Sequence, residues 1–260
     1  MRRLSLLIGL IMVSLLFLGG EGVARKRKKR AKGSKKAVKL LNEGIKQGQK
    51  GQFDDAMESF RKAIELDPKY AKAYFNLGLA YQFKKLHPAS VPHFLKAIEL
   101  EPDYALAYYR LGISWFEMEA YKAAIAAYER AIELEKPHVK KKKSKHLVAT
   151  SYLAIGRAQG MLKNYNDAIK AYKDAAETDD SQHEPYYRIA TIHIKLKAFA
   201  EAEKALLKAL EIDKKNGRYY FRLALVYQKL KNKEKKKKAL EQSCDNGYKK
   251  ACRVMKKKHR

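Results

Sequence analysis

The chain has 260 residues, a length that can bury a hydrophobic core without help from disulfides or metal ions. Hydrophobic residues make up 46% of it and aromatic residues 10%, which excludes a wholly disordered chain and a multi-span membrane protein. Lysine and arginine number 57 against 28 aspartates and glutamates, so the formal charge of +29 favours acidic partners. Since the chain has only 6 prolines and 14 glycines, we expect an all-α fold.

The segment at 1–24 has the layout of a signal peptide or membrane anchor. Two arginines precede an apolar run at 4–18, and small residues at 22–24 offer a cleavage site after Ala24. A basic linker follows at 25–36. We therefore expect a periplasmic or otherwise exported protein, either released or anchored to the inner membrane. The basic linker leaves a second interpretation open, because the positive-inside rule would keep the rest of the chain in the cytoplasm.

From position 37 onward, the sequence repeats at a fixed interval. Three positions recur together: a mostly aromatic position, a small residue four places later, and a second small residue. The three series are Leu40, Tyr74, Tyr108, Tyr152, Tyr186 and Tyr220; Gly44, Gly78, Gly112, Gly156, Ala190 and Ala224; and Ala63, Ala97, Ala131, Ala175, Ala209 and Ser243. All are interrupted once, by the basic insertion at 139–148. Each period holds two stretches with helical apolar spacing, which predicts a helix–turn–helix unit.

This pattern resembles the tetratricopeptide repeat. The best unit matches at seven positions, namely Tyr74, Leu77, Gly78, Tyr81, Phe94, Ala97 and Pro102. The resemblance implies a right-handed α-solenoid of about six units, three at 37–138 and three at 149–250, followed by a basic tail at 251–260. The first and sixth units depart from the pattern, as terminal repeats are expected to do.

In that family, the first helix of each unit lines a concave groove that binds peptides. Carried over by position, the resemblance assigns ten residues to this groove: Phe75, Asn76, Tyr109, Arg110, Arg157, Tyr187, Arg188, Arg218, Phe221 and Arg222. Aromatic rings beside guanidinium groups suit an extended peptide that carries carboxylates. The alternative is that some of these arginines pair with the protein's own acids. A clamp for a chaperone tail is not expected, because Leu41, Ile45 and Leu106 occupy three of its five positions.

Four basic runs stand apart from the groove, at 25–36, 136–145, 229–238 and 249–260. They are consistent with a solvated surface, or with contacts to nucleic acid, an acidic polysaccharide or an anionic membrane. No recognition helix or stacking platform accompanies them.

The two cysteines, Cys244 and Cys252, are too few for a four-ligand zinc site. Their segment resembles the disulfide-bridged, cysteine-rich helical repeats related to this family, which implies a disulfide between consecutive helices and an oxidising compartment. Two buried, reduced cysteines are the alternative.

The residues form no catalytic triad, phosphate loop or paired-acid motif, so we expect neither an enzyme nor a cofactor. The leading hypothesis is a non-catalytic scaffold of the cell envelope that binds a protein or peptide in its groove. The alternative hypothesis is a cytoplasmic protein that binds nucleic acid or the ribosome through its lysine-rich runs.

Overall fold

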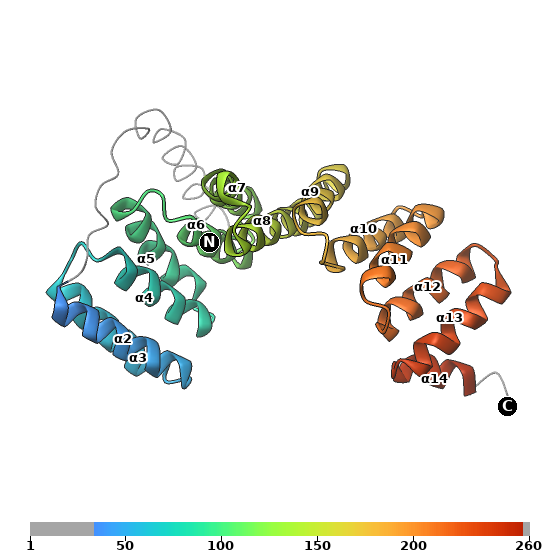
Figure 1. Cartoon of the computed structure of the whole chain (residues 1–260), viewed down its shortest axis with the longest axis horizontal. Coiled ribbons are helices and arrows are strands. Elements are labelled where there is room, and N and C mark those ends of the chain that lie inside the picture. The colour runs from blue at the N-terminus through green and yellow to red at the C-terminus, as the bar shows by residue number, and fades with distance from the viewer. Residues whose placement is uncertain (1–33, 257–260) are drawn as a thin grey trace. The chain divides into compact units, whose positions relative to one another are not determined.

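The computed structural model describes residues 34–256, and the expected signal or anchor at 1–24 lies outside them. Throughout the described range the chain consists of α-helices joined by short turns, with one 3₁₀ turn and no strand (Figure 1). The predicted all-α repeat architecture is confirmed. Within the same range, no helix combines the length and apolar character that crossing a bilayer requires.

The chain divides into two compact units, one ending at Ala158 and the other beginning at Gln159. Helix α8 contributes residues to both. The helices of the first unit are α2 (Lys35–Gln49), α3 (Phe53–Leu66), α4 (Ala71–Phe83), α5 (His87–Leu100), α6 (Ala105–Glu117), α7 (Tyr121–Glu135), the 3₁₀ turn η1 (Lys136–His138) and α8 (Lys142–Met161). Those of the second unit are α9 (Tyr165–Thr178), α10 (Glu184–Lys195), α11 (Phe199–Ile212), α12 (Gly217–Lys229), α13 (Lys233–Asp245) and α14 (Lys249–Lys256).

The recurring small residues hold the helix pairs together. In the first three pairs a glycine of the first helix faces an aromatic ring of the second, and a Cβ on Gly112 would lie 2.5 Å from Cε1 of Tyr128. The second small-residue series is fully buried in every pair: Ala63, Ala97, Ala131, Ala175, Ala209 and Ser243 are all 0% exposed. Because interiors are close-packed, small residues at these points let the helices approach.

The turn inside each pair has one recurring geometry. Its key residue has left-handed backbone, with φ between 57° and 79°, at Gly51, Lys85, Glu119, Lys163, Lys197 and Lys231. Only the first of these residues is glycine, the residue that adopts this conformation at least cost.

The basic insertion at 139–148 lengthens a helix. Helix α8 begins at Lys142, inside the insertion, and continues into the fourth repeat. The sequence left open whether the insertion would do this or separate two blocks of repeats.

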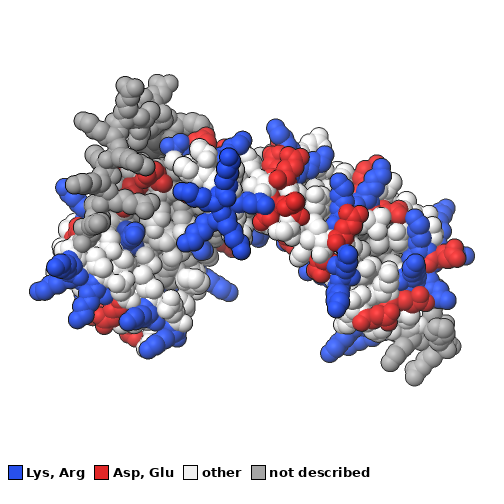
Figure 2. Space-filling view, in the orientation of Figure 1, with Lys and Arg blue, Asp and Glu red and all other residues white. Residues whose placement is uncertain are grey.

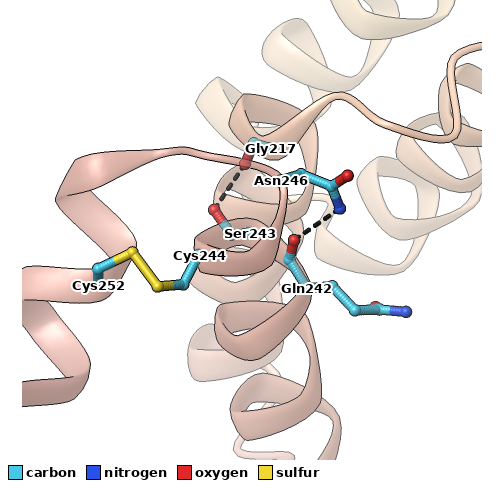
Figure 3. Close-up of a disulfide and its surroundings, with 6 residues drawn as sticks. All are labelled: Gly217, Gln242, Ser243, Cys244, Asn246 and Cys252. Atoms are coloured by element: carbon cyan, nitrogen blue, oxygen red, sulfur yellow. Dashed lines mark hydrogen bonds between the residues drawn. A yellow bond between two sulfur atoms is a disulfide. The ribbon is translucent and has the colours of Figure 1, made fainter.

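Helix α14 is joined to the sixth pair by a disulfide (Figure 3). The sulfur atoms of Cys244 and Cys252 lie 1.97 Å apart, and their Cα atoms 4.9 Å apart. Beside the bond, the Ser243 hydroxyl donates a 2.6 Å hydrogen bond to the carbonyl of Gly217, which connects α13 to α12. The disulfide implied by the resemblance is therefore present in the structure.

Candidate protein-binding surface

The first helices of the pairs carry the residues assigned to the groove. In the first unit these helices also touch one another directly, α2 with α4 and α4 with α6. In the second unit, the Tyr187 ring of α10 stacks on the Tyr219 ring of α12 at 4.6 Å, and the Arg218 guanidinium lies 5.3 Å from the centre of the Tyr187 ring. Equivalent first helices are thus neighbours within each unit.

Three of the aromatic residues assigned to the open face are instead buried. Phe75, Tyr187 and Phe221 are 5%, 5% and 8% exposed. Phe75 packs against Phe94 and Tyr104, and Phe221 against Tyr248 of the following turn. Each ring fills the space between consecutive helix pairs, where burying a large aromatic surface stabilises the stack. The polar and basic members of the set remain as the accessible ones.

In the first unit, most of the accessible members already make contacts within the protein. Asn76 donates to the backbone carbonyl of Lys72 at 2.8 Å, and Tyr109 packs on Tyr128. Arg110 is half-buried, and its Nε atom has no hydrogen-bond partner among the described atoms. The exposed Arg157 of α8 places its guanidinium 5.0 Å from the centre of the Phe116 ring. Tyr109 and Arg157 both lie close enough to Tyr128 to influence the pKa of its phenol.

In the second unit, the assigned arginines belong to a regular surface that we call the α10–α12 stripe. Its members are Glu184, Arg188 and Thr191 on α10, and Arg218, Arg222 and Leu225 on α12. On each helix the three residues are separated by four and then three positions, so they share one face. The two sets occupy equivalent positions, one repeat period apart. Arg218, Thr191 and Leu225 are exposed, and Leu225 is 39% exposed. The stripe therefore combines guanidinium groups with an apolar side chain and a hydroxyl.

One arginine of the stripe is already paired. Both Nε and Nη2 of Arg188 contact Oε1 of Glu184, at 2.7 and 2.6 Å, which confirms the alternative that an internal acid engages some of these arginines. Arg222 has no carboxylate partner among the described residues. Since Glu184 is the only acid of the stripe, its net charge is positive.

The end of the stripe is fixed by a polar contact between α10 and α12. The His183 ring nitrogen Nδ1 and the Tyr219 hydroxyl are 2.7 Å apart, and His183 Nε2 lies 3.7 Å from Asp213. Burial, followed by the carboxylates of Glu184 and Asp213, raises the pKa of Tyr219 to about 12. The phenol is therefore neutral at physiological pH and serves as a hydrogen-bonding group that positions the helices.

Sequence models of the tetratricopeptide repeat match four segments of the chain, at residues 49–84, 71–104, 105–136 and 161–235. Together with the observed helix pairs, these matches decide the family. The chain is a tetratricopeptide repeat protein.

Known proteins resemble this tetratricopeptide repeat protein mainly in fold. A 46-residue segment, 18% of the chain, is 48% identical to an uncharacterized protein of Methanocaldococcus jannaschii and spans about half (54%) of that relative's length. The crystal structure of MamA is 28% identical, with a TM-score of 0.60 over 68% of this chain and 97% of MamA.

Two other solved structures share the fold at lower identity. One is YrrB, described as a tetratricopeptide repeat protein with an unusual peptide-binding site, at 21% identity and a TM-score of 0.57 over 77% of this chain and 99% of YrrB. The other is the type IV pilus biogenesis factor PilW, at 14% identity and a TM-score of 0.65 over 80% of this chain and 92% of PilW.

A second charged surface lies where the insertion enters α8. Five lysines are exposed here and form what we call the lysine cluster: Lys136, Lys140, Lys141, Lys142 and Lys143. Figure 2 shows a dense group of basic side chains in this part of the molecule. The first turn of α8 contains no acid, so several of these cations stand at the positive end of a helix, where like charge is unfavourable.

Over the described residues, no group of acids, histidines and cysteines is arranged to hold a metal ion.

Proposed function

We propose that this tetratricopeptide repeat protein is an exported, non-catalytic scaffold of the cell envelope. Its α10–α12 stripe binds an acidic, extended segment of a partner protein. The observation that carries the proposal is the placement of Arg218 and Arg222 on adjacent turns of α12, beside the exposed Leu225 and with Glu184 as the one internal acid. Guanidinium groups form strong, directional hydrogen bonds to carboxylates.

Two features support export. The sequence at 1–24 has the layout of a signal peptide or inner-membrane anchor, and the Cys244–Cys252 disulfide is of a kind that persists in oxidising compartments. We expect the mature protein in the periplasmic or membrane fraction, with Arg25 at its amino terminus if the segment is cleaved. Recovery of the chain from the cytosol with an intact amino terminus would contradict this part of the proposal.

The stripe is tested with a fluorescent decapeptide of alternating glutamate and leucine, and with a glutamine–leucine decapeptide as the uncharged control. Binding of the acidic peptide to the full chain is measured by anisotropy. We expect R218A/R222A to weaken binding by more than about tenfold, because hydrogen bonds to charged groups contribute about 1.5–3 kcal/mol each.

The matched control is K214A/K215A, which removes the same charge from two exposed residues of the loop before α12. Unfolding midpoints of both variants must equal that of the wild type. Equal weakening by both pairs would show a nonspecific charge effect and would count against the stripe.

The alternative function, a cytoplasmic nucleic-acid- or ribosome-associated protein, is favoured by the lysine cluster. Phosphate contacts release counterions, so binding to a single-stranded RNA should fall steeply with salt. Replacing Lys140, Lys141, Lys142 and Lys143 with glutamine should reduce the slope of log K against log salt by about 3, at roughly 0.7 per lost contact. A slope unchanged by these substitutions would remove this alternative.

A further inference from the structure

The helix-pair turns of the second unit share an exposed pattern that the α10–α12 stripe does not use. At the second and third turns an exposed leucine directly precedes a lysine with left-handed backbone, and at the first turn the exposed Met161 lies two positions before Lys163. The exposed apolar residues are Met161, Leu196 and Leu230, at 55%, 47% and 39% of their surface. The left-handed lysines are Lys163, Lys197 and Lys231. We call this surface the turn edge.

Contacts between pairs place these turns beside one another. The Lys195 ammonium lies 5.0 Å from the centre of the Tyr165 ring, which links the second turn to the first. A shallow hollow of about 440 Å³ between the same two turns is lined by Lys163, Asn164, Tyr165, Asn166, Asp167 and Leu196. On the other side, Lys235 of α13 forms a 3.0 Å ion pair with Glu203 of α11. The three turns therefore form one continuous edge.

The turns of this edge carry a net positive charge. Six lysines stand there: Lys163, Lys195, Lys197, Lys229, Lys231 and Lys233. The nearby acids Asp167, Glu201 and Glu234 lie in the first turns of the following helices, where the helix dipole favours negative charge. Lysines flank each of the two leucines on both sides, so a flat anionic surface would meet cations around an apolar centre.

The sequence breaks two local rules along this edge, and a turn of the first unit breaks the same rules at Lys85, between the exposed Phe83 and Leu86. Glycine would adopt the left-handed conformation at less cost than lysine, and Gly51 shows that the same turn accepts it. Large apolar side chains at the tips of turns also remain in water.

We propose that the turn edge docks onto an anionic phospholipid surface. Met161, Leu196 and Leu230 enter the interfacial layer, and the flanking lysines place their ammonium groups at lipid phosphates while their aliphatic stems cover the apolar contact. A nucleic acid would satisfy the lysines but would leave the leucines without a role, since stacking on bases requires aromatic or guanidinium groups. The proposal does not depend on the acidic-peptide proposal, because the two surfaces share no residue.

The first test measures binding of the full chain to vesicles of phosphatidylglycerol and phosphatidylcholine by co-sedimentation. We expect L196Q/L230Q to weaken vesicle binding about tenfold or more, because the contact with lipid then buries two fewer leucine side chains. L207Q/I212Q is the matched control: these residues are 41% and 37% exposed in the same unit but lie in the second half of α11, outside the turn edge. All variants keep the same amino-terminal segment, so any membrane binding by that segment is common to all of them. Differences between the variants therefore arise from the substituted positions.

A second measurement reports on the edge itself. With Leu230→Trp, tryptophan emission should shift to shorter wavelength when anionic vesicles are added, whereas Leu207→Trp should show no such shift. Trp115 is 2% exposed and present in both variants, so it provides a constant background. Vesicle binding by another part of the chain would leave both spectra unchanged and would overturn the proposal.

The lysines are tested with K195Q/K197Q/K229Q/K231Q against K170Q/K173Q/K214Q/K215Q, which removes equal charge from other positions of the same unit. Each lysine near an anionic membrane contributes a few-fold in affinity, so the first variant should lose binding to phosphatidylglycerol vesicles by more than about 100-fold relative to the second. If L196Q/L230Q retains wild-type vesicle binding while the lysine variant alone loses binding to a single-stranded RNA, the edge is a nucleic-acid surface and the membrane proposal is wrong.

Discussion

Complementary volumes at single residues determine how closely the paired helices pack. Glycine faces an aromatic ring in the first three pairs, as in Gly44 opposite Phe60. In the fifth and sixth pairs the small residue is alanine, and the residue 16 places later is leucine, as in Ala190 with Leu206. The added methyl group is thus accompanied by a smaller partner. This exchange can be read from the sequence once the repeat period is known.

Two glycines of α2 give a matched prediction. A Cβ on Gly44 would lie 2.5 Å from Cε1 of Phe60 and 3.1 Å from the backbone oxygen of Ala56, whereas one on Gly48 would find its nearest neighbour at 3.9 Å. We expect Gly44→Ala to lower the free energy of unfolding by about 1–3 kcal/mol through overpacking. Gly48→Ala should raise it by about 0.5–1 kcal/mol through helix propensity. Urea unfolding checks both, and a stabilised Gly44→Ala would contradict the tight packing.

The left-handed turn residues give a prediction of the opposite sign. Lys197 has a φ of 60°, which costs a side-chain-bearing residue about 1–2 kcal/mol relative to right-handed backbone. We expect Lys197→Gly to raise the free energy of unfolding by about 0.5–1 kcal/mol after the added flexibility of the unfolded chain is subtracted. Lys195 is the last residue of helix α10, so Lys195→Gly should lower the free energy of unfolding by about 1 kcal/mol. If both glycines destabilise equally, the backbone conformation at Lys197 is not a source of strain.

The sequence located the helices to which the resemblance assigns a groove, but it did not give the exposure of each residue on them. Phe75, Tyr187 and Phe221 follow the recurring aromatic position by one place, and so lie near both the open face and the next helix pair. How far the next pair covers them depends on the distance between pairs, which the period does not encode. Lys195 was not singled out from the sequence, although it follows Thr191 at a helical spacing of four, whereas Lys229 begins one of the recognised basic runs.

At the level of elements, helix pairs could be predicted and their ends could not. The apolar spacing of each repeat is decisive for the second helices, whereas a first helix such as α4 buries Ala71, Ala73 and Phe75 on more than one face. Helix α8 starts at Lys142, ahead of the fourth repeat at 149–182, since the lysines from Lys142 onward are compatible with helix and no proline follows Pro137 there. Lysine-rich segments are equally compatible with an extended, solvated linker, so composition alone does not determine the start of this helix.

The last element, α14, yields a prediction about the disulfide. The bond joins two positions with a sequence separation of 8, and closing so short a loop stabilises the folded state by about 2–3 kcal/mol in the chain-entropy description. We expect Cys252→Ser to expose α14 amides, including that of the fully buried Ala251, to hydrogen exchange while α9 to α11 keep their protection.

Chemical reduction of the wild type should reproduce the exchange pattern of Cys252→Ser, and reduction of the variant should add nothing. Unchanged protection of α14 after reduction would mean that Tyr248, which packs on Phe221, and the rest of the apolar contact suffice to hold the helix.

For the whole molecule, the formal charge of +29 governs the response of stability to salt. Compact packing brings like charges closer than they are in the unfolded chain, so self-repulsion destabilises the fold at low ionic strength. The ion pairs that oppose this are largely exposed, such as Lys62–Glu58 at 56% and 64% side-chain exposure, and exposed pairs contribute little. Added salt shortens the Debye length from about 30 Å at 0.01 M to about 8 Å at 0.15 M, and therefore screens the repulsion.

We expect the unfolding temperature to rise with sodium chloride over this range, in contrast to a protein stabilised mainly by ion pairs. The quadruple glutamine variant of Lys140, Lys141, Lys142 and Lys143 should unfold at a higher temperature than the wild type in about 0.01 M salt, and the difference should shrink at about 0.15 M. K170Q/K173Q/K214Q/K215Q removes the same total charge from two separate pairs and should give a smaller gain, because four consecutive lysines repel one another more strongly than two pairs do. A wild-type unfolding temperature that falls as salt is added would show that attractive pairs outweigh the net charge, and the repulsion argument would fail.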